Sequence, residues 1–186
     1  RATKKIGPYI PDLRTYDEFR EPFLGGGSVA IYVTKKYPDL KIWVNDLYEP
    51  LVNFWQQLQK NGHDLQIMLM DLKSRYPDPL SAKALFLSSK NYLEIDNEDP
   101  LWRAIYFYVV NKCSFSGLTE SSSFSSQASD SNFSMKSIMK LEGYTQLIKN
   151  WDITNYSYER LLDEGSNKNA FVYLDPPYDI KDNLYG

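Results

Sequence analysis

The residues with the clearest chemical potential are Asp175-Pro176-Pro177-Tyr178, which follow an apolar run at 171–174. Two consecutive prolines cannot continue a helix and remove two backbone donors, so this peptide leaves the strand end rigid, with its carbonyls free. A carboxylate, a fixed carbonyl and an aromatic ring form a pocket for a planar ring that carries an amino group. The amino group donates to Asp175 and to the Pro176 carbonyl, while Tyr178 stacks on the ring. The competing interpretation is a proline-rich turn that ends an edge strand.

A second candidate is the glycine loop in Glu21-Pro-Phe-Leu-Gly-Gly-Gly-Ser28. Glycines at a strand-to-helix junction allow a tight turn and let a ligand approach amides that a Cβ atom would block. A triphosphate-binding loop is disfavoured, because no lysine stands between Gly27 and Ser28. The dinucleotide fingerprint is met only in its relaxed form, by Gly25, Gly27 and then Ala30. A tight turn without a ligand is the alternative.

Asp46 directly follows the next apolar run, residues 41–45. An acidic side chain placed so after a glycine loop can accept hydrogen bonds from both hydroxyls of a ribose. The alternative is a helix cap, in which Asn45 or Asp46 opens a helix that begins near Glu49. The loop and the acid together favour a cofactor that contains a nucleoside.

Hydrophobic periodicity predicts the elements that position these residues. The strand candidates are residues 19–23, 41–45, 152–156 and 170–174. A helix from Ser28 to the residue before Pro38 joins the first two, and this βαβ unit predicts a parallel sheet. Helical spacing covers residues 51–58, 65–72, 81–95, 101–110 and 137–151. The serine-rich residues 114–137 predict a long polar loop or an irregular hairpin.

Composition excludes several classes of protein. The 186 residues carry a formal net charge of −3, so no basic field marks a polyanionic partner. The single cysteine, Cys113, excludes an internal disulfide and fits a reducing compartment; we expect it in the core. His63 is expected in a solvated loop between helices, and no metal site is predicted because no ligand set accompanies it. The tryptophans are expected in the core: Trp43, Trp55, Trp102 and Trp151.

Four motifs in this order resemble a known family. Glu-Pro-Phe-x-Gly-x-Gly-Ser, Asn-Asp after the second strand, Asn111-Lys-Cys-Ser-Phe-Ser-Gly-Leu118 and the late Asp-Pro-Pro-Tyr are similar to the Dam-type (D12 class) DNA adenine-N6 methyltransferases. The resemblance implies an α/β fold with a Rossmann-like, doubly wound, mainly parallel sheet, the class I methyltransferase core. Residues 1–52 and 145–186 would form this core. Residues 53–144 would form an inserted, mainly helical target-recognition region with a loop or hairpin.

The same resemblance implies an enzyme that transfers a methyl group from S-adenosylmethionine to the amino nitrogen of a flipped adenine in DNA. The implied catalytic residues are Asp175, Pro176, Pro177 and Tyr178. The implied cofactor-binding residues are Phe23, Gly25, Gly27, Ser28, Asp46, Ser157, Tyr158 and Asp175. The implied DNA-binding residues are Asn111, Lys112, Ser114, Ser116 and Asn132. Ser157 stands where family members often have an acid.

The family's Pro-Gly-Gly-Lys segment is absent, as are the remaining strands and the Asp-His-containing stretch that normally follow Asp-Pro-Pro-Tyr, so we expect a chain truncated at both ends. The alternatives are a catalytically incomplete DNA-binding remnant and an RNA adenine-N6 methyltransferase. We expect double-stranded DNA as partner, a monomer, a possible restriction endonuclease partner, and a cytoplasmic protein encoded by a bacterium or a phage. No run approaches the ~20 apolar residues of a membrane span, and no signal peptide is evident.

Overall fold

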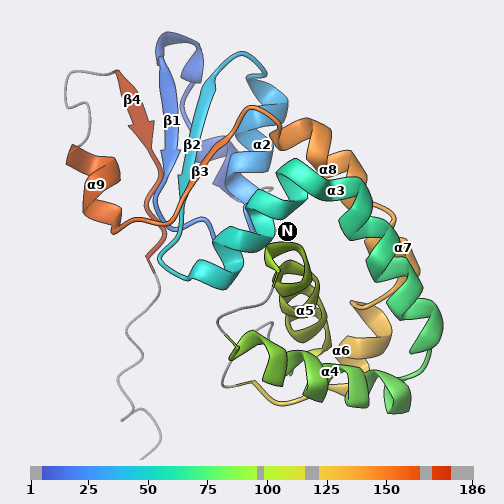
Figure 1. Cartoon of the computed structure of the whole chain (residues 1–186). Helices are drawn as coiled ribbons and strands as arrows, with labels where there is room; N and C mark the ends of the chain where they lie inside the picture. The colour runs from blue at the N-terminus through green and yellow to red at the C-terminus, as the bar shows by residue number, and fades with distance from the viewer. Residues whose placement is uncertain (1–5, 96–98, 116–121, 164–168, 177–186) are drawn as a thin grey trace, which may run out of the picture. The chain divides into compact units, whose positions relative to one another are not determined.

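The structure is a computed structural model of the chain, and it describes residues 6–95, 99–115, 122–163 and 169–176. The chain forms two compact units, which are treated separately below. Residues 1–47 and 151–186 form the α/β unit, and residues 48–150 form the helical unit. Figure 1 shows the sheet of the first unit and the helices of the second.

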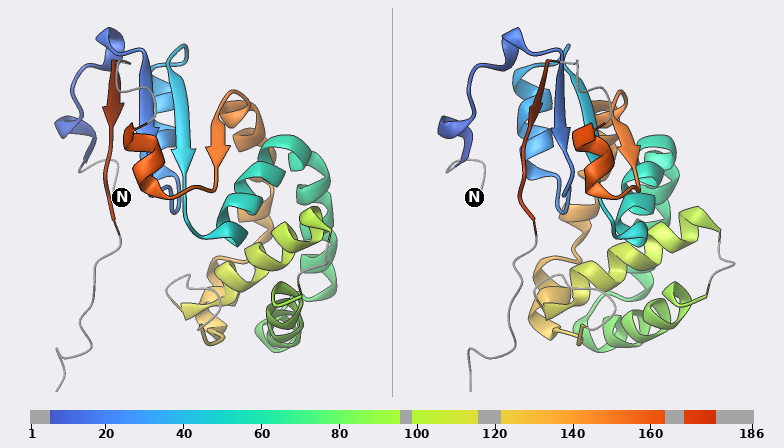
Figure 2. Two further views of the ribbon diagram at one scale, coloured as in Figure 1. Left: turned by 60° about the vertical axis from the view of Figure 1, so that its left-hand side comes forward. Right: turned by 90° about the vertical axis from the view of Figure 1, so that its left-hand side faces the viewer.

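The α/β unit is built on a parallel sheet. Its strands are β1 (Glu18–Glu21), β2 (Lys41–Asn45), β3 (Asp152–Thr154) and β4 (Ala170–Val172). Their order is β3-β2-β1-β4, so the chain moves outward from β1 to β3 and then returns to the other side of β1. Glu18 pairs with Lys41 on one side and with Ala170 on the other (Figures 1 and 2). The expected parallel, Rossmann-like sheet is confirmed.

Helices cover both faces of this sheet. The helical elements of the unit are η1 (Gly7–Tyr9), η2 (Leu13–Thr15), α2 (Ser28–Lys36) and α9 (Tyr158–Asp163). Neighbouring residues of a strand point to opposite faces. Glu21 accepts a hydrogen bond from the Ala30 amide of α2 at 2.9 Å, whereas Arg20 donates to the Leu161 carbonyl of α9. Hence α2 and α9 lie on opposite faces (Figure 2).

The helical unit has an aromatic core. Its helices are α3 (Glu49–Arg75), α4 (Pro79–Leu93), α5 (Pro100–Cys113), α6 (Ser126–Ser131), α7 (Met135–Ile138) and α8 (Leu141–Ile148). The Phe54 ring of α3 lies 5.6 Å from the Phe107 ring and 5.8 Å from the Tyr108 ring of α5. Asp78 and Asp99 accept backbone hydrogen bonds as the N-caps of α4 and α5, and a proline follows each of them.

Along the chain the α/β unit stops at Leu47 and resumes at Trp151, whereas the predicted boundaries are residues 52 and 145. The reason for the first shift lies at the start of α3. The Tyr48 ring is 6.2 Å from the Phe107 ring, and Glu49 forms an ion pair of 2.5 Å with Arg103. Because Phe107 and Arg103 belong to α5, the first turn of α3 already packs within the helical unit.

α3 corrects the prediction of a loop at Asn61-Gly-His-Asp. The helix continues through this segment with a kink at Asn61 (φ −127°, ψ 30°), so His63 lies in a helix with its side chain exposed. Gly62 permits a close approach of α8, since a Cβ atom there would lie 1.8 Å from the Thr145 hydroxyl oxygen. That hydroxyl donates to the Leu58 carbonyl at 2.8 Å, the acceptor that the Gly62 amide uses in a regular helix.

The described part of the serine-rich segment is also more helical than predicted. It contains α6 and α7, and the helix predicted at 137–151 is divided between α7 and α8. Ser125 and Ser134 cap α6 and α7, each accepting a hydrogen bond from a backbone amide of the first turn (3.2 and 3.3 Å). The serine content that indicated a loop therefore serves, at these two positions, to open helices.

Four of the five core predictions are confirmed, since Cys113, Trp43, Trp55 and Trp151 are buried. The prediction for Trp102 is wrong: this side chain is 36% exposed and stacks on Tyr106, with the ring centroids 5.7 Å apart. None of the described helices combines the length and the apolar character that crossing a membrane requires.

Candidate active site

The glycine loop lies at the carboxyl end of β1. Gly25 and Gly27 have φ values of 47° and 64°, in the left-handed region that residues with a Cβ atom seldom adopt. The Leu24 amide donates to the Asn45 carbonyl at 2.8 Å, which ties the loop to β2. A Cβ atom added at Gly25 or Gly26 would meet nothing within 4 Å. The loop therefore borders open space, as a cradle for a ligand requires.

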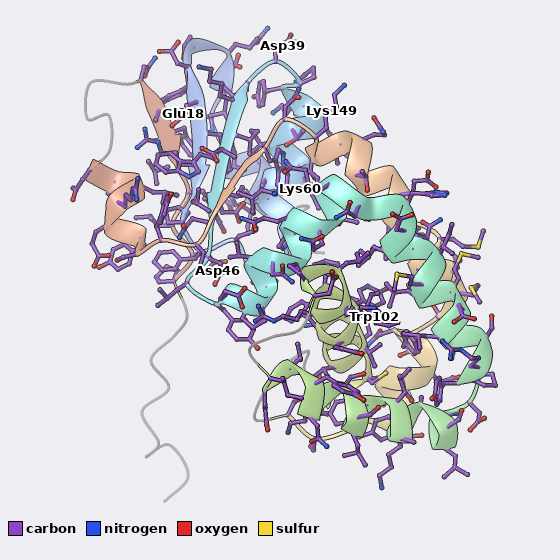
Figure 3. All side chains as sticks on the ribbon, in the orientation of Figure 1. Glu18, Asp39, Asp46, Lys60, Trp102 and Lys149 are labelled. Carbon is purple, nitrogen blue, oxygen red and sulfur yellow. The ribbon has the colours of Figure 1, made fainter. Side chains whose placement is uncertain are left out.

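Asp46 lies directly after β2 (Figure 3), and its carboxylate is hydrogen-bonded to this loop. Its Oδ2 accepts a hydrogen bond from the Gly25 amide at 3.0 Å. The N-cap of α3 is Tyr48, so the alternative in which Asn45 or Asp46 caps this helix is wrong. Two motifs that the sequence associated with one cofactor are thus in contact.

The segment after β3 supplies the third part of this edge. The Phe23 and Tyr158 rings lie 5.3 Å apart with their planes tilted by 34°. Ser157 is exposed, and its hydroxyl donates to the Glu159 carboxylate. Ser28 is the exposed first residue of α2. All the cofactor-binding residues predicted in the loop, after β2 and after β3 lie at the carboxyl edge of the sheet.

β4 brings Asp175 to the same edge. Val172 pairs with Arg20 of β1, and the Tyr173 amide donates to the Arg20 carbonyl at 2.8 Å. Asp175 and Pro176 follow and are exposed, while Pro177 and Tyr178 lie outside the described residues. The strand order reverses between β1 and β4, and open α/β sheets commonly bind ligands beyond the carboxyl ends of the strands at this point.

Glu21 is a residue of this edge that sequence reasoning missed. It is the last residue of β1, and its side chain is buried with Oε2 accepting the Ala30 amide. Burial raises the pKa of Glu21 to about 8, and the carboxyl groups of Asp175 and Asp46 add to the increase against the lowering effect of the Ala30 hydrogen bond. Three carboxyl groups therefore interact at the ends of neighbouring strands, and Glu21 retains its proton at neutral pH. Only the strand order reveals this grouping.

The predicted DNA-binding residues belong to the helical unit, apart from Ser116, which lies outside the described residues. Asn111 and Lys112 are half-buried in the last turn of α5, and burial lowers the pKa of Lys112. Ser114 is buried and its hydroxyl donates to the Asn111 carbonyl at 3.2 Å, so this side chain does not face solvent. Asn132 is exposed at the end of α6.

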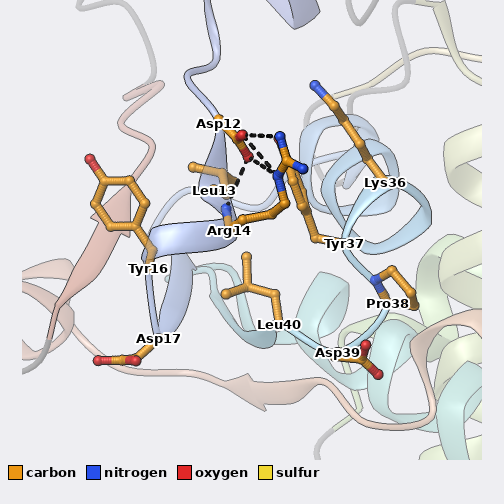
Figure 4. Close-up of a pocket in the computed structure, with 10 residues that line it drawn as sticks. All are labelled: Asp12, Leu13, Arg14, Tyr16, Asp17, Lys36, Tyr37, Pro38, Asp39 and Leu40. Carbon is orange, nitrogen blue, oxygen red and sulfur yellow. Dashed lines mark hydrogen bonds and ion pairs between the residues drawn. The ribbon is translucent and has the colours of Figure 1, made fainter.

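A pocket of about 790 Å³ opens at the other edge of the sheet, between the segments that precede β1 and β2 (Figure 4). Asp12 and Arg14 in its wall are paired, and the hydrogen bonds from Arg14 lower the pKa of Asp12 to about 2. Asp39 lines this pocket and precedes β2, whereas Asp46 follows β2 (Figure 3). The pocket is therefore separate from the site that the predicted residues form.

Three relatives show which proteins share this sequence pattern. The chain is 25% identical over 169 residues to the Type II methyltransferase M.MjaIII of Methanocaldococcus jannaschii, covering 87% of this chain and 58% of the relative. It is 24% identical over 196 residues to the DNA N-6-adenine-methyltransferase of Escherichia phage P1, covering 98% of this chain and 23% of the relative. It is 26% identical over 191 residues to the Type II methyltransferase M.CviBI of Paramecium bursaria Chlorella virus NC1A, covering 98% and 66%.

The chain thus spans between about a quarter and two thirds of the length of these relatives. A family model matches nearly the whole chain. Residues 1–185 match the model of the "D12 class N6 adenine-specific DNA methyltransferase" family. The match includes both stretches of the α/β unit and the helical unit between them. This chain belongs to the D12 class of N6 adenine-specific DNA methyltransferases.

Proposed function

We propose that the whole protein transfers a methyl group from S-adenosylmethionine to the N6 amino group of adenine in double-stranded DNA. The observation that carries this proposal is the meeting of the glycine loop, Asp46 and the Asp175 segment at the carboxyl edge of one sheet. Family membership supports the same reaction, as do the names of the relatives.

The residues of this edge fit the cofactor. S-adenosylmethionine supplies an electrophilic methyl group on a positively charged sulfonium. The loop around Gly25 leaves open space for a ligand, and the Asp46 carboxylate is placed to accept hydrogen bonds from ribose hydroxyls. The paired rings of Phe23 and Tyr158 would form an apolar surface for the adenine ring. The carboxylates of Asp46 and Asp175 suit a ligand with positive charge.

Asp175 and Pro176 would bind the acceptor. The Asp175 carboxylate and the Pro176 carbonyl would each accept a hydrogen bond from the adenine amino group. These oxygens would also stabilise the positive charge that develops on the amino nitrogen. No strong base is needed beforehand, because the amine loses its proton after attack. The site aligns the nitrogen with the methyl group, while Tyr178 would stack on a base that has left the duplex.

The helical unit would supply the contacts that select the DNA target. We retain Asn111, Lys112, Ser116 and Asn132 as candidates for phosphate or base contacts. Ser114 is omitted because its hydroxyl is buried. A monomeric state and a restriction endonuclease partner stay predictions.

The deciding experiment incubates the whole protein with radiolabelled S-adenosylmethionine and either duplex DNA or RNA. Digestion to nucleosides followed by mass spectrometry identifies the methylated base. We expect N6-methyladenine in DNA. Label in RNA would favour the RNA methyltransferase, and DNA binding without any transfer would favour the incomplete remnant.

A further inference from the structure

Asn45, the last residue of β2, has a buried side chain that uses its full hydrogen-bonding capacity. Its Nδ2 donates to the Pro22 carbonyl at 3.2 Å and to the Tyr156 carbonyl at 2.9 Å. Its Oδ1 accepts from the Tyr156 amide at 2.8 Å and from the Thr154 hydroxyl at 2.9 Å. A side-chain amide offers two donor hydrogens and two acceptor lone pairs, so all four are used. Such a satisfied buried amide rigidifies its surroundings.

These bonds join two segments that are distant in sequence. Pro22 is the first residue after β1 and begins the glycine loop. The Asn45 backbone carbonyl also accepts a hydrogen bond from the Leu24 amide of that loop. Tyr156 lies two residues after the end of β3, and the Asn45 side chain binds both its amide and its carbonyl. One residue of the central strand β2 thus fixes the segments that leave β1 and β3. The Phe23 and Tyr158 rings, which contact each other, lie one and two residues beyond these anchor points.

We propose that Asn45 is a positioning residue that sets the separation between the glycine loop and residues 156–158, and thereby the width of the site for the adenosine part of the cofactor. The inference rests on the proposed function, to which it adds a residue that does not itself touch the cofactor. Asn45 acts through the backbone of Pro22 and Tyr156.

The chemistry explains why an amide is required at this position. Aspartate has nearly the same shape and keeps both acceptors, but its carboxylate would face the carbonyl oxygens of Pro22 and Tyr156 without a hydrogen to donate. The orientation of the amide is fixed, because the Tyr156 amide can only donate and the Tyr156 carbonyl can only accept. Trp43 Nε1 donates to the Thr154 hydroxyl at 2.9 Å, and this bond orients the hydroxyl that donates to Asn45 Oδ1.

The test compares Asn45→Asp with Asn53→Asp in the whole protein. Asn53 is a matched control, since it is a buried asparagine of the helical unit whose Nδ2 donates to the Pro100 carbonyl at 2.9 Å. Asn45→Asp should weaken S-adenosylhomocysteine binding, measured by calorimetry, by roughly tenfold to a hundredfold, because two buried acceptors lose their donors. Asn53→Asp should lower the melting temperature but leave this affinity within about twofold of wild type.

Hydrogen exchange provides a second measurement that needs no cofactor. In Asn45→Asp the amides of Leu24 and Tyr156 should exchange about tenfold faster, while those in the middle of β2 stay protected. Wild-type exchange at both amides, or an equal loss of affinity in the two variants, would overturn the proposal. If the wild-type protein binds no S-adenosylhomocysteine, the proposed function fails, and the exchange rates still decide the role of Asn45.

Thr154→Val covers the case in which Asn45→Asp does not fold. This variant keeps the shape of the side chain and removes only the hydroxyl that supports the amide. Affinity should fall by about twofold to fivefold, and the Tyr156 amide should exchange faster, because the Asn45 side chain loses one of its four hydrogen bonds and Trp43 Nε1 loses its acceptor. Wild-type values for both measurements in this variant would contradict the proposal.

Discussion

Polar side chains at the carboxyl edge of the sheet differ in role from those that cap the helices of the helical unit. In the α/β unit they reach from one strand end to the backbone of another segment: Asp46 accepts the Gly25 amide, and Asn155 donates to the Asp46 carbonyl at 2.8 Å. In the helical unit, Asp78 and Ser134 instead bind the first turn of the helix that they open. The same residue types thus join distant segments at the sheet edge and open helices at Asp78 and Ser134.

The difference predicts separable effects of substitution. Changes to polar groups of the sheet edge should alter binding or turnover, because those groups hold the loops of the site. The two changes proposed in the helical unit, at Phe133 and Ser134, should instead alter the stability of the protein. Four of the following substitutions test this separation, and Glu21→Gln tests how pH changes stability at the sheet edge.

Phe133→Ala should lower the free energy of unfolding by about 3–5 kcal/mol, because it removes a large side chain from a closely packed interior. Phe133 is fully buried, and its ring centroid lies 6.4 Å from that of Tyr108. Urea denaturation followed by circular dichroism measures the change. Phe115→Ala, at a phenylalanine that is 71% exposed, is the control and should change stability by less than about 0.5 kcal/mol.

Asp175→Ala should lower the rate of methyl transfer by roughly 100- to 1000-fold, because the developing charge on the acceptor nitrogen loses its carboxylate. DNA affinity should change much less, since phosphate contacts dominate it. Single-turnover kinetics and a gel-shift assay separate the two quantities. The control is Asp152→Ala, at an exposed residue of β3. Wild-type turnover in Asp175→Ala would refute the proposed mechanism.

Asp46→Ala should weaken cofactor binding by about 1.5–3 kcal/mol if its carboxylate accepts the ribose hydroxyls. Asp46→Asn keeps an oxygen that can accept the Gly25 amide, so it separates support of the loop from binding of the ribose. Calorimetry should rank the affinities as wild type, then Asn, then Ala. Asp39→Ala, at the other end of β2, should match wild type. Unchanged affinity in Asp46→Ala would restrict Asp46 to a role in the loop.

Glu21→Gln should remove a pH dependence of stability. Burial raises the pKa of Glu21 from 4.5 to about 8, so the folded state retains a proton that the unfolded state has lost between these values. Its contribution to stability is fully present below pH 4.5 and is lost as the pH rises through 8, at up to about 1.4 kcal/mol per pH unit. Denaturation at several pH values should show this slope in wild type and in exposed Glu94→Gln, but not in Glu21→Gln.

Ser134→Ala should have the smallest effect, a loss of about 1 kcal/mol in the free energy of unfolding, because α7 loses its N-cap. Ser88→Ala is the control, since that exposed serine lies inside α4 and its hydroxyl only donates to carbonyls of its own helix. A melting temperature for Ser134→Ala equal to that of wild type would show that this cap is dispensable.

Local patterns predicted the sheet well. The apolar runs gave β1, β2 and β4 within a few residues, and the glycines before Ser28 gave the start of α2. Glycine also caused an error, because Asn61-Gly-His-Asp has the composition of a turn. The need for Gly62 comes from Thr145, a residue of another helix, and such a close approach has no local signal.

The site was predictable only in the parts that a motif marks. Motifs mark the glycine loop, Asp46 and the Asp175 segment, which lie at one edge of the sheet, but Glu21 and Asn45 were not recognised as separate contributors. The role of Asn45 depends on β3 lying beside β2, and the role of Glu21 depends on which face of β1 carries α2. Both facts are properties of the folded sheet, and neither can be predicted from the residue type.

The pairing of β4 with β1 also has a consequence for synthesis of the protein. The helical unit is one continuous stretch of chain, so a ribosome that has released residue 150 has supplied all of it. Strand β1 can pair with β4 only after Ala170, the partner of Glu18, has been synthesised. Domains generally fold as units during translation. The edge that joins the glycine loop to Asp175 is therefore completed late, only after the whole helical unit has been synthesised.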